Sequence, residues 1–231
     1  MTRATEPGAE RRGRAGRRTM AAEDAHGGAF ATSSVAVLRD AIAAARPTPG
    51  CGVAAAVALS VGLALVVKAL RISDRQSSAD ATDLVARGKA LMARLERLAD
   101  DDADAFADYL ALRHTDLDDD QDRIDAAEAA ARTATAVPLA LARDGLRVLV
   151  IAERAIPACR TMLHADVLGG ALIAHGALRA ALASLSADAR ALEDAAASDM
   201  AIAAGHGLSL RADACLRSVR LQLDPSATDP D

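Results

Sequence analysis

Apolar residues along this chain recur every three or four positions, which is the period of an α-helix rather than a strand. A first helix is predicted over 34–45, because apolar residues recur on one of its faces and Ser33 or Ser34 can cap its start. Pro47 and Pro49 then end it. The same period continues through most of the chain, which favours an all-α fold.

A second predicted helix, 51–70, consists largely of small apolar residues, so a neighbouring helix can approach it closely. It follows the turn Pro47-Thr48-Pro49-Gly50-Cys51-Gly52, whose backbone N–H groups would face an anionic or polar ligand at the positive helix N-terminus. Its uncharged part, 51–67, has about 17 residues, the lower limit for crossing a bilayer. We interpret it as a buried core helix and not as a membrane span.

Later stretches show the same helical period with polar breaks between them. The helices that they predict are 81–112, 122–155 with a kink at Pro138, 165–185, and 187–223 with an interruption at 205–207. We therefore predict an all-α, up-and-down bundle of about five to six helices in a single domain over 32–223.

Composition agrees with a helical bundle. Alanine dominates, and the chain has no Trp, one Tyr and two Phe, so a sheet would lack the aromatic residues that strands favour. With 52% apolar residues the chain can form a core. A net charge of −5 argues against nucleic acid as the partner.

The two ends of the chain and the cysteines carry further expectations. We expect 1–31, which is rich in arginine, and 224–231 to be disordered tails; no apolar stretch of a secretory signal follows the arginines.

Cys51, Cys159 and Cys215 are odd in number and far apart. They fit neither a metal site nor a disulfide framework, and they suit the cytoplasm.

An acidic run contains the first candidate for chemistry. Asp101 and Asp104 are expected on a solvated face, but Asp102 falls on the apolar stripe between Leu98 and Phe106. A carboxylate in that position must be paired, protonated or exposed to a pocket. It therefore either lines a pocket or makes a contact in a dimer or at a helix end.

Asp166 is the second candidate. As an N-cap or first-turn residue it has a structural explanation, and it can also have a functional one. His164 precedes it, while His175 lies about 16 Å further along the helix, too far to share a metal ion with His164. We expect no metal site, and we expect His175 to be a core histidine. Lys68 and Arg71, which end the apolar helix, suit its dipole and can also attract a carboxylate-bearing ligand.

Together these features resemble the cyclodeaminase/cyclohydrolase family, which includes formiminotetrahydrofolate cyclodeaminase and methenyltetrahydrofolate cyclohydrolase. The resemblance covers about 34–190. The segments that carry it are Pro47-Thr48-Pro49-Gly50 with its alanine-rich helix, Asp101-Asp102-Ala103-Asp104-Ala105-Phe106, Thr133-Ala134-Thr135-Ala136-Val137-Pro138-Leu139-Ala140, Asp166 and Arg179.

The resemblance implies a homodimeric bundle with a folate pocket between helices. It implies acid/base chemistry on a tetrahydrofolate derivative, with neither a metal nor a permanently bound cofactor. Asp102 and Asp166 would be the base and the proton donor, in either order. The binding residues would be the turn Gly50, Cys51 and Gly52, with Lys68, Arg71 or Arg75 attracting the glutamate tail of the folate.

The chain departs from the family pattern at several positions. Cys51 interrupts the glycine run, Ser184 and Asp188 replace two asparagines, and the segment 159–165 replaces an asparagine-containing loop. In that loop Arg160 and His164 can act as replacements, with His164 as an acid/base group near neutral pH. Two hypotheses follow: a divergent folate cyclohydrolase or cyclodeaminase, or a non-catalytic helical dimer that binds another ligand or partner. A membrane-associated protein is a weaker third reading.

Overall fold

The computed structural model of the protein describes residues 33–73, 79–113, 120–224 and 226. This part of the chain contains six α-helices, two short 3-10 turns and no strand, as the sequence predicts. The helices are α2 (Val35–Ile42), α3 (Cys51–Ser73), α4 (Ala79–Arg113), α5 (Asp120–Ala155), α6 (His164–Ala189) and α7 (Ala195–Leu223), with the 3-10 turns η3 (Ile156–Ala158) and η4 (Thr161–Leu163).

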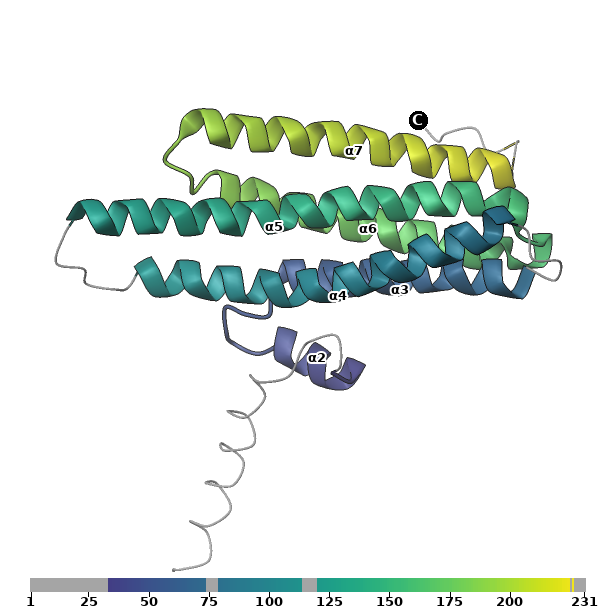
Figure 1. Cartoon of the computed structure of the whole chain (residues 1–231), viewed down its shortest axis with the longest axis horizontal. Helices are drawn as coiled ribbons and strands as arrows, with labels where there is room; N and C mark the ends of the chain where they lie inside the picture. The colour runs from purple at the N-terminus through teal and green to yellow at the C-terminus, as the bar shows by residue number, and fades with distance from the viewer. Residues whose placement is uncertain (1–32, 74–78, 114–119, 225, 227–231) are drawn as a thin grey trace, which may run out of the picture.

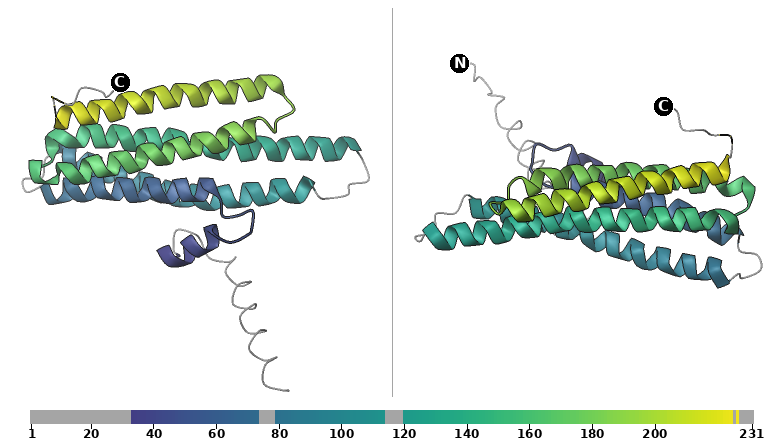
Figure 2. Two further views of the ribbon diagram at one scale, coloured as in Figure 1. Left: turned by 180° about the vertical axis from the view of Figure 1, so that it is seen from behind. Right: turned by 90° about the horizontal axis from the view of Figure 1, so that it is seen from above.

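The five long helices form the predicted up-and-down bundle. Consecutive helices run antiparallel, and α5 contacts α3, α4, α6 and α7 (Figure 1). Figure 2 shows α3 and α6 side by side on the face opposite to the viewer of Figure 1, while the short helix α2 lies beside the bundle. Ser34 caps α2 by accepting a hydrogen bond from the N–H of Val37 at 3.3 Å. The predicted fold class is confirmed.

Two predicted boundaries at the C-terminal end are wrong. Helix α6 continues to Ala189, and α7 begins only at Ala195, after Asp194 has capped it. Helix α7 then runs through the glycines at 205 and 207 without the predicted interruption. Gly205 is buried, and a Cβ there would lie 3.1 Å from the side chain of Leu185. This glycine therefore provides room for α6 rather than a break.

Other boundaries differ by smaller amounts. Helix α2 ends at Ile42, three residues before the predicted end, and α5 continues on both sides of Pro138. The predicted tail 1–31 and most of 224–231 lie outside the described residues.

Helix α3 is the centre of the apolar core. Eleven of its residues are buried, and Leu59, Leu63 and Leu70 have no exposed side-chain surface. Each such leucine contributes about 1.5–3 kcal/mol to folding. The sequence interpretation of α3 as a core helix is consistent with this packing.

The backbones of α3 and α6 touch at a pair of glycines. A Cβ on Gly62 would lie 2.7 Å from the carbonyl oxygen of Gly170, and a Cβ on Gly170 would overlap the carbonyl oxygen of Gly62. Neither position can hold a side chain unless the helices move apart. The small residues of α3 thus permit the close approach that the sequence predicts.

By length and composition alone, two helical stretches could cross a membrane: Cys51–Ser73 and Thr161–Ala189. The sequence analysis considered only the first of them as a possible membrane span. In their most apolar windows 56% and 44% of the residues are buried inside the bundle. Each helix therefore has an apolar side that the rest of the described chain does not cover.

We predict that Gly170→Ala lowers the free energy of unfolding by about 2–3 kcal/mol, because the new methyl group overpacks the contact with α3. Gly207→Ala is the control: a Cβ there meets nothing within 4 Å. It should raise stability by about 0.5–1 kcal/mol through the unfolded chain. Urea unfolding measures both changes, and equal midpoints would contradict the predicted contact.

Candidate functional site

A cavity of about 290 Å³ lies at the N-terminal end of α3. Four helices and the turn before α3 contribute to it. The lining residues are Pro47, Thr48, Gly50, Cys51, Gly52, Asp102, Phe106, Ala134, Ser184, Ala187 and Asp188. Three segments singled out in the sequence thus meet at this cavity: the turn, the acidic segment with Asp102 and Phe106, and the Thr133–Ala140 segment with Ala134.

Asp102 lies directly against the start of α3. A Cβ on Gly52 would overlap the carboxyl group of Asp102, so a side chain at that position would displace this carboxyl group. The backbone N–H of Val53 donates a hydrogen bond to the Asp102 carboxylate. The sequence reading expected a ligand at the N-terminus of this helix, but at Val53 the anion is the protein's own carboxylate. Partial burial nevertheless raises the pKa of Asp102, and the Val53 bond only partly opposes this effect.

Asp188 brings a second carboxyl group to the same cavity. It lies in the last turn of α6, one turn after Ser184. Burial and, secondarily, the charge of Asp102 raise the pKa of Asp188 to about 6. Two neighbouring carboxyl groups that share a poorly solvated space do not ionise independently. One of them can therefore hold or release a proton near neutral pH.

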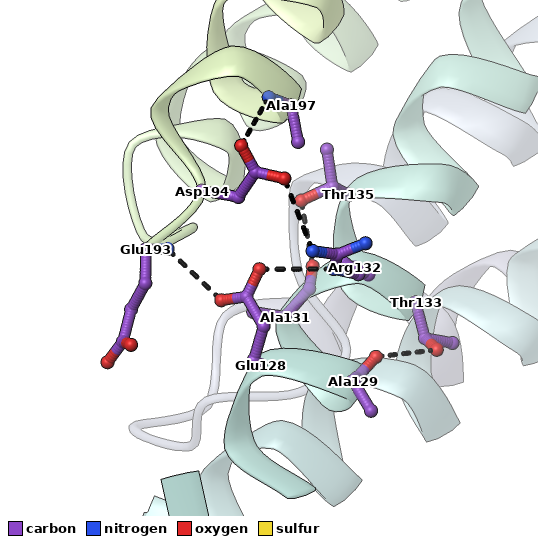
Figure 3. Close-up of polar contacts among 9 residues, drawn as sticks. All are labelled: Glu128, Ala129, Ala131, Arg132, Thr133, Thr135, Glu193, Asp194 and Ala197. Atoms are coloured by element: carbon purple, nitrogen blue, oxygen red, sulfur yellow. Dashed lines mark hydrogen bonds and ion pairs between the residues drawn. The ribbon is translucent and has the colours of Figure 1, made fainter. Parts of the chain in front are cut away.

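A network of polar contacts fixes the loop that follows Asp188 (Figure 3). Glu128 of α5 accepts a hydrogen bond from the backbone N–H of Glu193 at 3.0 Å and forms an ion pair with Arg132 at 3.1 Å. Arg132 also reaches Asp194 at 3.3 Å. Since Asp194 caps α7, these contacts tie α5 to the turn between α6 and α7. They hold the end of α6, and with it Asp188, against the bundle.

The other predicted catalytic aspartate lies at the opposite end of the bundle. Asp166, in the first turn of α6, forms an ion pair with Lys68 at 3.0 Å. Lys68 lies sixteen residues after Gly52 on α3, or about 24 Å along the helix. Within one chain the structure therefore does not bring Asp166 to the cavity that contains Asp102.

The remaining predicted residues also lie at this second end. The Arg160 N–H donates a hydrogen bond to Ser73 Oγ at 2.9 Å, and Arg71 is exposed in the last turn of α3. His164 Nε2 is buried and has no hydrogen-bond partner in the described part of the chain. Burial raises the pKa of the Cys159 thiol, and a hydrogen bond with Ser73 partly offsets this. Arg75 lies outside the described residues.

His175 is not enclosed in the core as predicted. Its side chain is 21% exposed, and Nε2 lies 2.6 Å from Asp213 Oδ1 on α7. The residue connects α6 to α7 rather than facing a pocket. Within the described ranges no group of three or more His, Cys, Asp or Glu side chains could hold a metal ion.

Asp188 and Ser184 are the site residues that sequence reasoning undervalued. Both appeared only as substitutions of expected asparagines, so they counted as lost hydrogen-bonding groups. In the structure they line the cavity, and Asp188 supplies its second carboxyl group. Their spacing of four residues near the end of an apolar helix was the available signal, since it places both on one face.

Comparisons with known proteins identify the family and the fold of the chain. A model of the formiminotransferase-cyclodeaminase family matches residues 34–204. The methenyltetrahydrofolate cyclohydrolase of Methylorubrum extorquens is 29% identical over 183 residues, which cover 76% of this chain and 88% of that protein. The structure of formiminotetrahydrofolate cyclodeaminase from Thermotoga maritima matches with a TM-score of 0.77 at 16% identity, over 84% of this chain and 97% of that one. At that identity the structural match shows the fold alone.

The raised pKa of Asp188 predicts a pH-dependent stability. The folded protein keeps this proton up to about pH 6, whereas the ordinary aspartate pKa is 3.8, so the unfolded chain loses the proton earlier. Stability should therefore fall as the pH rises from about 4 to 6. Asp188→Asn removes this effect, and we expect its Tm to exceed that of the original protein by about 2–4 °C at pH 7.5 but not at pH 4.

Thermal unfolding followed by circular dichroism at the two pH values measures this difference. Asp101→Asn, an exposed neighbour of Asp102 on α4, is the control and should show no pH-dependent gain. The same Tm change for Asp188→Asn at both pH values would argue against a shared, buried carboxyl pair.

Proposed function

Since the chain belongs to the formiminotransferase-cyclodeaminase family, we propose that it hydrolyses methenyltetrahydrofolate in the cavity that contains Asp102 and Asp188. The family and the relatives' names support a folate one-carbon cyclohydrolase or cyclodeaminase function. We favour the cyclohydrolase reaction because the curated relative at 29% identity carries that name. The observation that carries the proposal is the pair of carboxyl groups in one cavity.

The chemistry of the substrate suits two carboxyl groups. The methenyl bridge is a cation, in which one carbon joins two nitrogens, and a carboxylate near it stabilises the bound state. Asp102 is placed to orient the bridge, and the hydrogen bond from the N–H of Val53 favours its charged form against the burial that raises its pKa. Asp188, with a pKa of about 6, is placed to exchange a proton near neutral pH.

The proposed reaction has two steps. Water attacks the bridge carbon, a new C–O bond forms, and Asp188 takes one proton from the water. The hydroxyl of the adduct then loses its proton as the carbonyl forms, one C–N bond breaks, and the leaving nitrogen gains a proton from Asp188. The product is the formyl derivative, and one proton is released overall, because a cation has become neutral.

The size of the cavity suggests that one chain does not enclose the whole substrate. Its volume of about 290 Å³ is at or below the usual range of about 300–1,000 Å³ for a ligand pocket. A single chain can therefore hold the reacting bridge, while the rest of the folate extends beyond it.

We propose that the outer face of α3 and α6 binds a second copy of the chain. Val61, Leu172 and Ile173 are 52%, 42% and 38% exposed on this face. Gly176 beside them has open space where a Cβ would lie. Helices that are apolar on all sides are normally buried, and two copies that share one self-complementary face would bury these.

Such a dimer offers a role for Lys68 and Asp166. If the two-fold axis crosses the helices, the C-terminal end of α3 in one copy lies beside the N-terminal end of α3 in the other. Lys68 and Asp166 of the partner subunit would then border the cavity with Asp102. The cation could attract the carboxylates of the folate tail. His164, with its unpartnered Nε2, would reach the same region.

We also propose that the protein works in the cytoplasm. Cys51, Cys159 and Cys215 are free thiols, which suits a reducing compartment. The dimer face accounts for the uncovered apolar sides of α3 and α6 without a membrane.

We predict that the purified protein accelerates the loss of ultraviolet absorbance of 5,10-methenyltetrahydrofolate, and that Asp102→Asn lowers kcat/KM by about 10²–10⁴-fold. Asp101→Asn, which changes an exposed carboxylate one residue away, should leave the rate unchanged. Decay no faster than in buffer, with no folate binding by calorimetry, would reject the proposal. It would favour a non-catalytic dimer that binds another ligand or partner.

We further predict that two inactive variants restore each other's activity. Asp102→Asn and Asp166→Asn should each be inactive as homodimers if one site takes Asp102 from one copy and Asp166 from the other. After the variants are unfolded together and refolded as an equal mixture, half of the dimers are mixed and each has one intact site. About one quarter of the original activity should return. No recovery, with mixed dimers demonstrated by mass spectrometry, would show that the site lies within one chain.

A further inference from the structure

A second, larger cavity than the one with Asp102 lies away from the candidate active site, in a groove between α4, α5 and α7. Its volume is about 690 Å³, within the range of pockets for whole small molecules. Six arginines line it: Arg87, Arg94, Arg143, Arg147, Arg154 and Arg211. We call this cavity the arginine groove. No residue of α3 or α6 lines it, whereas both helices line the cavity with Asp102.

The bottom of the arginine groove is apolar. Its aliphatic lining residues are Leu84, Leu91, Leu146, Val150, Ile151 and Leu208. Val150, at 36%, is the most exposed of them. The groove therefore combines a strip of hydrocarbon with guanidinium groups around it. This combination suits a ligand that has both an apolar body and negative charges.

A buried carboxylate orients two of the arginines. Asp144 has no exposed side-chain surface and accepts a hydrogen bond from Arg94 Nε at 2.6 Å and another from Arg147. Arg94 donates through Nε, and its two terminal nitrogens form no hydrogen bond or ion pair with another described residue, so they are available to a ligand. A guanidinium held by a second residue loses less entropy when it binds an anion.

The groove has more positive charge than the ion pairs among the described residues compensate. Asp144 pairs with Arg94 and Arg147, and Asp83 pairs with Arg87 at 2.7 Å. Arg143 and Arg154 form no ion pair with any described residue. Six guanidinium groups thus meet two carboxylates, because Arg94 and Arg147 share Asp144, so the set has a net surplus of four positive charges. A protein with a net charge of −5 has concentrated these cations on one face.

The arginines are spread along the groove rather than gathered at one point. Arg143 and Arg154 are eleven residues apart on α5, or about 16 Å along the helix. Arg94 meets Asp144 near the first of these positions, and the aliphatic strip runs between the two. A single small anion such as inorganic phosphate would reach only one part of this row.

We propose that the arginine groove binds a nucleoside polyphosphate. A triphosphate carries about four negative charges at neutral pH, which matches the uncompensated charge, and guanidinium groups bind phosphate oxygens in pairs. The apolar strip would contact the base, and the planar guanidinium groups can stack on it. In a chain with one Tyr, two Phe and no Trp, arginine is the main planar side chain available for this.

Two other occupants are less well matched. A folate has its carboxylates at one end, so it would leave the arginines at the other end uncompensated. A second copy of the chain would have to present several carboxylates along an apolar ridge, whereas the uncovered apolar face on α3 and α6 has small residues and no comparable acidic row.

Isothermal titration calorimetry with ATP, inorganic tripolyphosphate and adenosine tests the proposal on the full chain. We expect ATP to bind, tripolyphosphate to bind more weakly, and adenosine to bind weakest. The double variant Arg143→Ala/Arg154→Ala should weaken ATP binding at least about tenfold. Its activity on methenyltetrahydrofolate should be unchanged, because neither residue lines the cavity with Asp102.

The matched control is Arg97→Ala/Arg220→Ala, which removes two exposed arginines from α4 and α7 outside the groove. It should bind ATP as the original protein does. The proposal is wrong if ATP does not bind, if both double variants lose affinity equally, or if tripolyphosphate binds as tightly as ATP. Competition by methenyltetrahydrofolate would instead assign the groove to folate. A change of oligomeric state in the Arg143→Ala/Arg154→Ala variant would assign it to a subunit interface.

Discussion

The contact between the backbones of α3 and α6 at Gly62 and Gly170 determines where both candidate sites of the bundle lie. Because the two helices run antiparallel and touch at Gly62 and Gly170, each end of α3 meets the opposite end of α6. At one end Gly52 comes to Asp188, and at the other Lys68 comes to Asp166. A side chain at either glycine would separate the helices and widen both ends. The position of the carboxyl groups thus depends on two missing Cβ atoms in the core.

At the N-terminus of α3, where a helix can bind an external anion, the carboxyl group of Asp102 takes the place of that anion. Asp102 accepts a hydrogen bond from the N–H of Val53, and Gly52 leaves room for its carboxyl group. The helix N-terminus favours the charged form of Asp102, while burial favours the neutral form. Asp188 has only the second influence and the added repulsion from Asp102, so its pKa rises to about 6. Unequal surroundings therefore give the two carboxyl groups unequal proton affinities, which is the property that the proposed acid/base reaction would use.

Charge is distributed unevenly over the bundle. The Asp102 cavity is lined by acids and small residues, whereas the arginine groove on the other side of α4 and α5 has six guanidinium groups. Asp144 joins the arginine groove to the core, since its carboxylate is fully buried and bound to two of those arginines. The groove is consequently a built part of the bundle and not a chance gathering of surface side chains.

The sequence by itself determined the helical class, the up-and-down order and most helix positions, because a period of three to four residues is a local property of the chain. It also indicated Asp102 as a candidate for lining a pocket, since a carboxylate on the apolar stripe of a helix is recognisable from the sequence alone. It missed the continuity of α7 through Gly205, because a glycine that breaks a helix and one that admits a neighbour look alike in sequence.

Only the tertiary structure decided which candidates share a site. Asp102 and Asp188 are 86 positions apart in sequence and meet, whereas Asp102 and Asp166 do not meet within one chain. The pairing depends on which helix ends adjoin, and that depends on the packing of α3 against α6. The arginine groove had no sequence signal either, because its six arginines come from three helices and face one another only after those helices have packed.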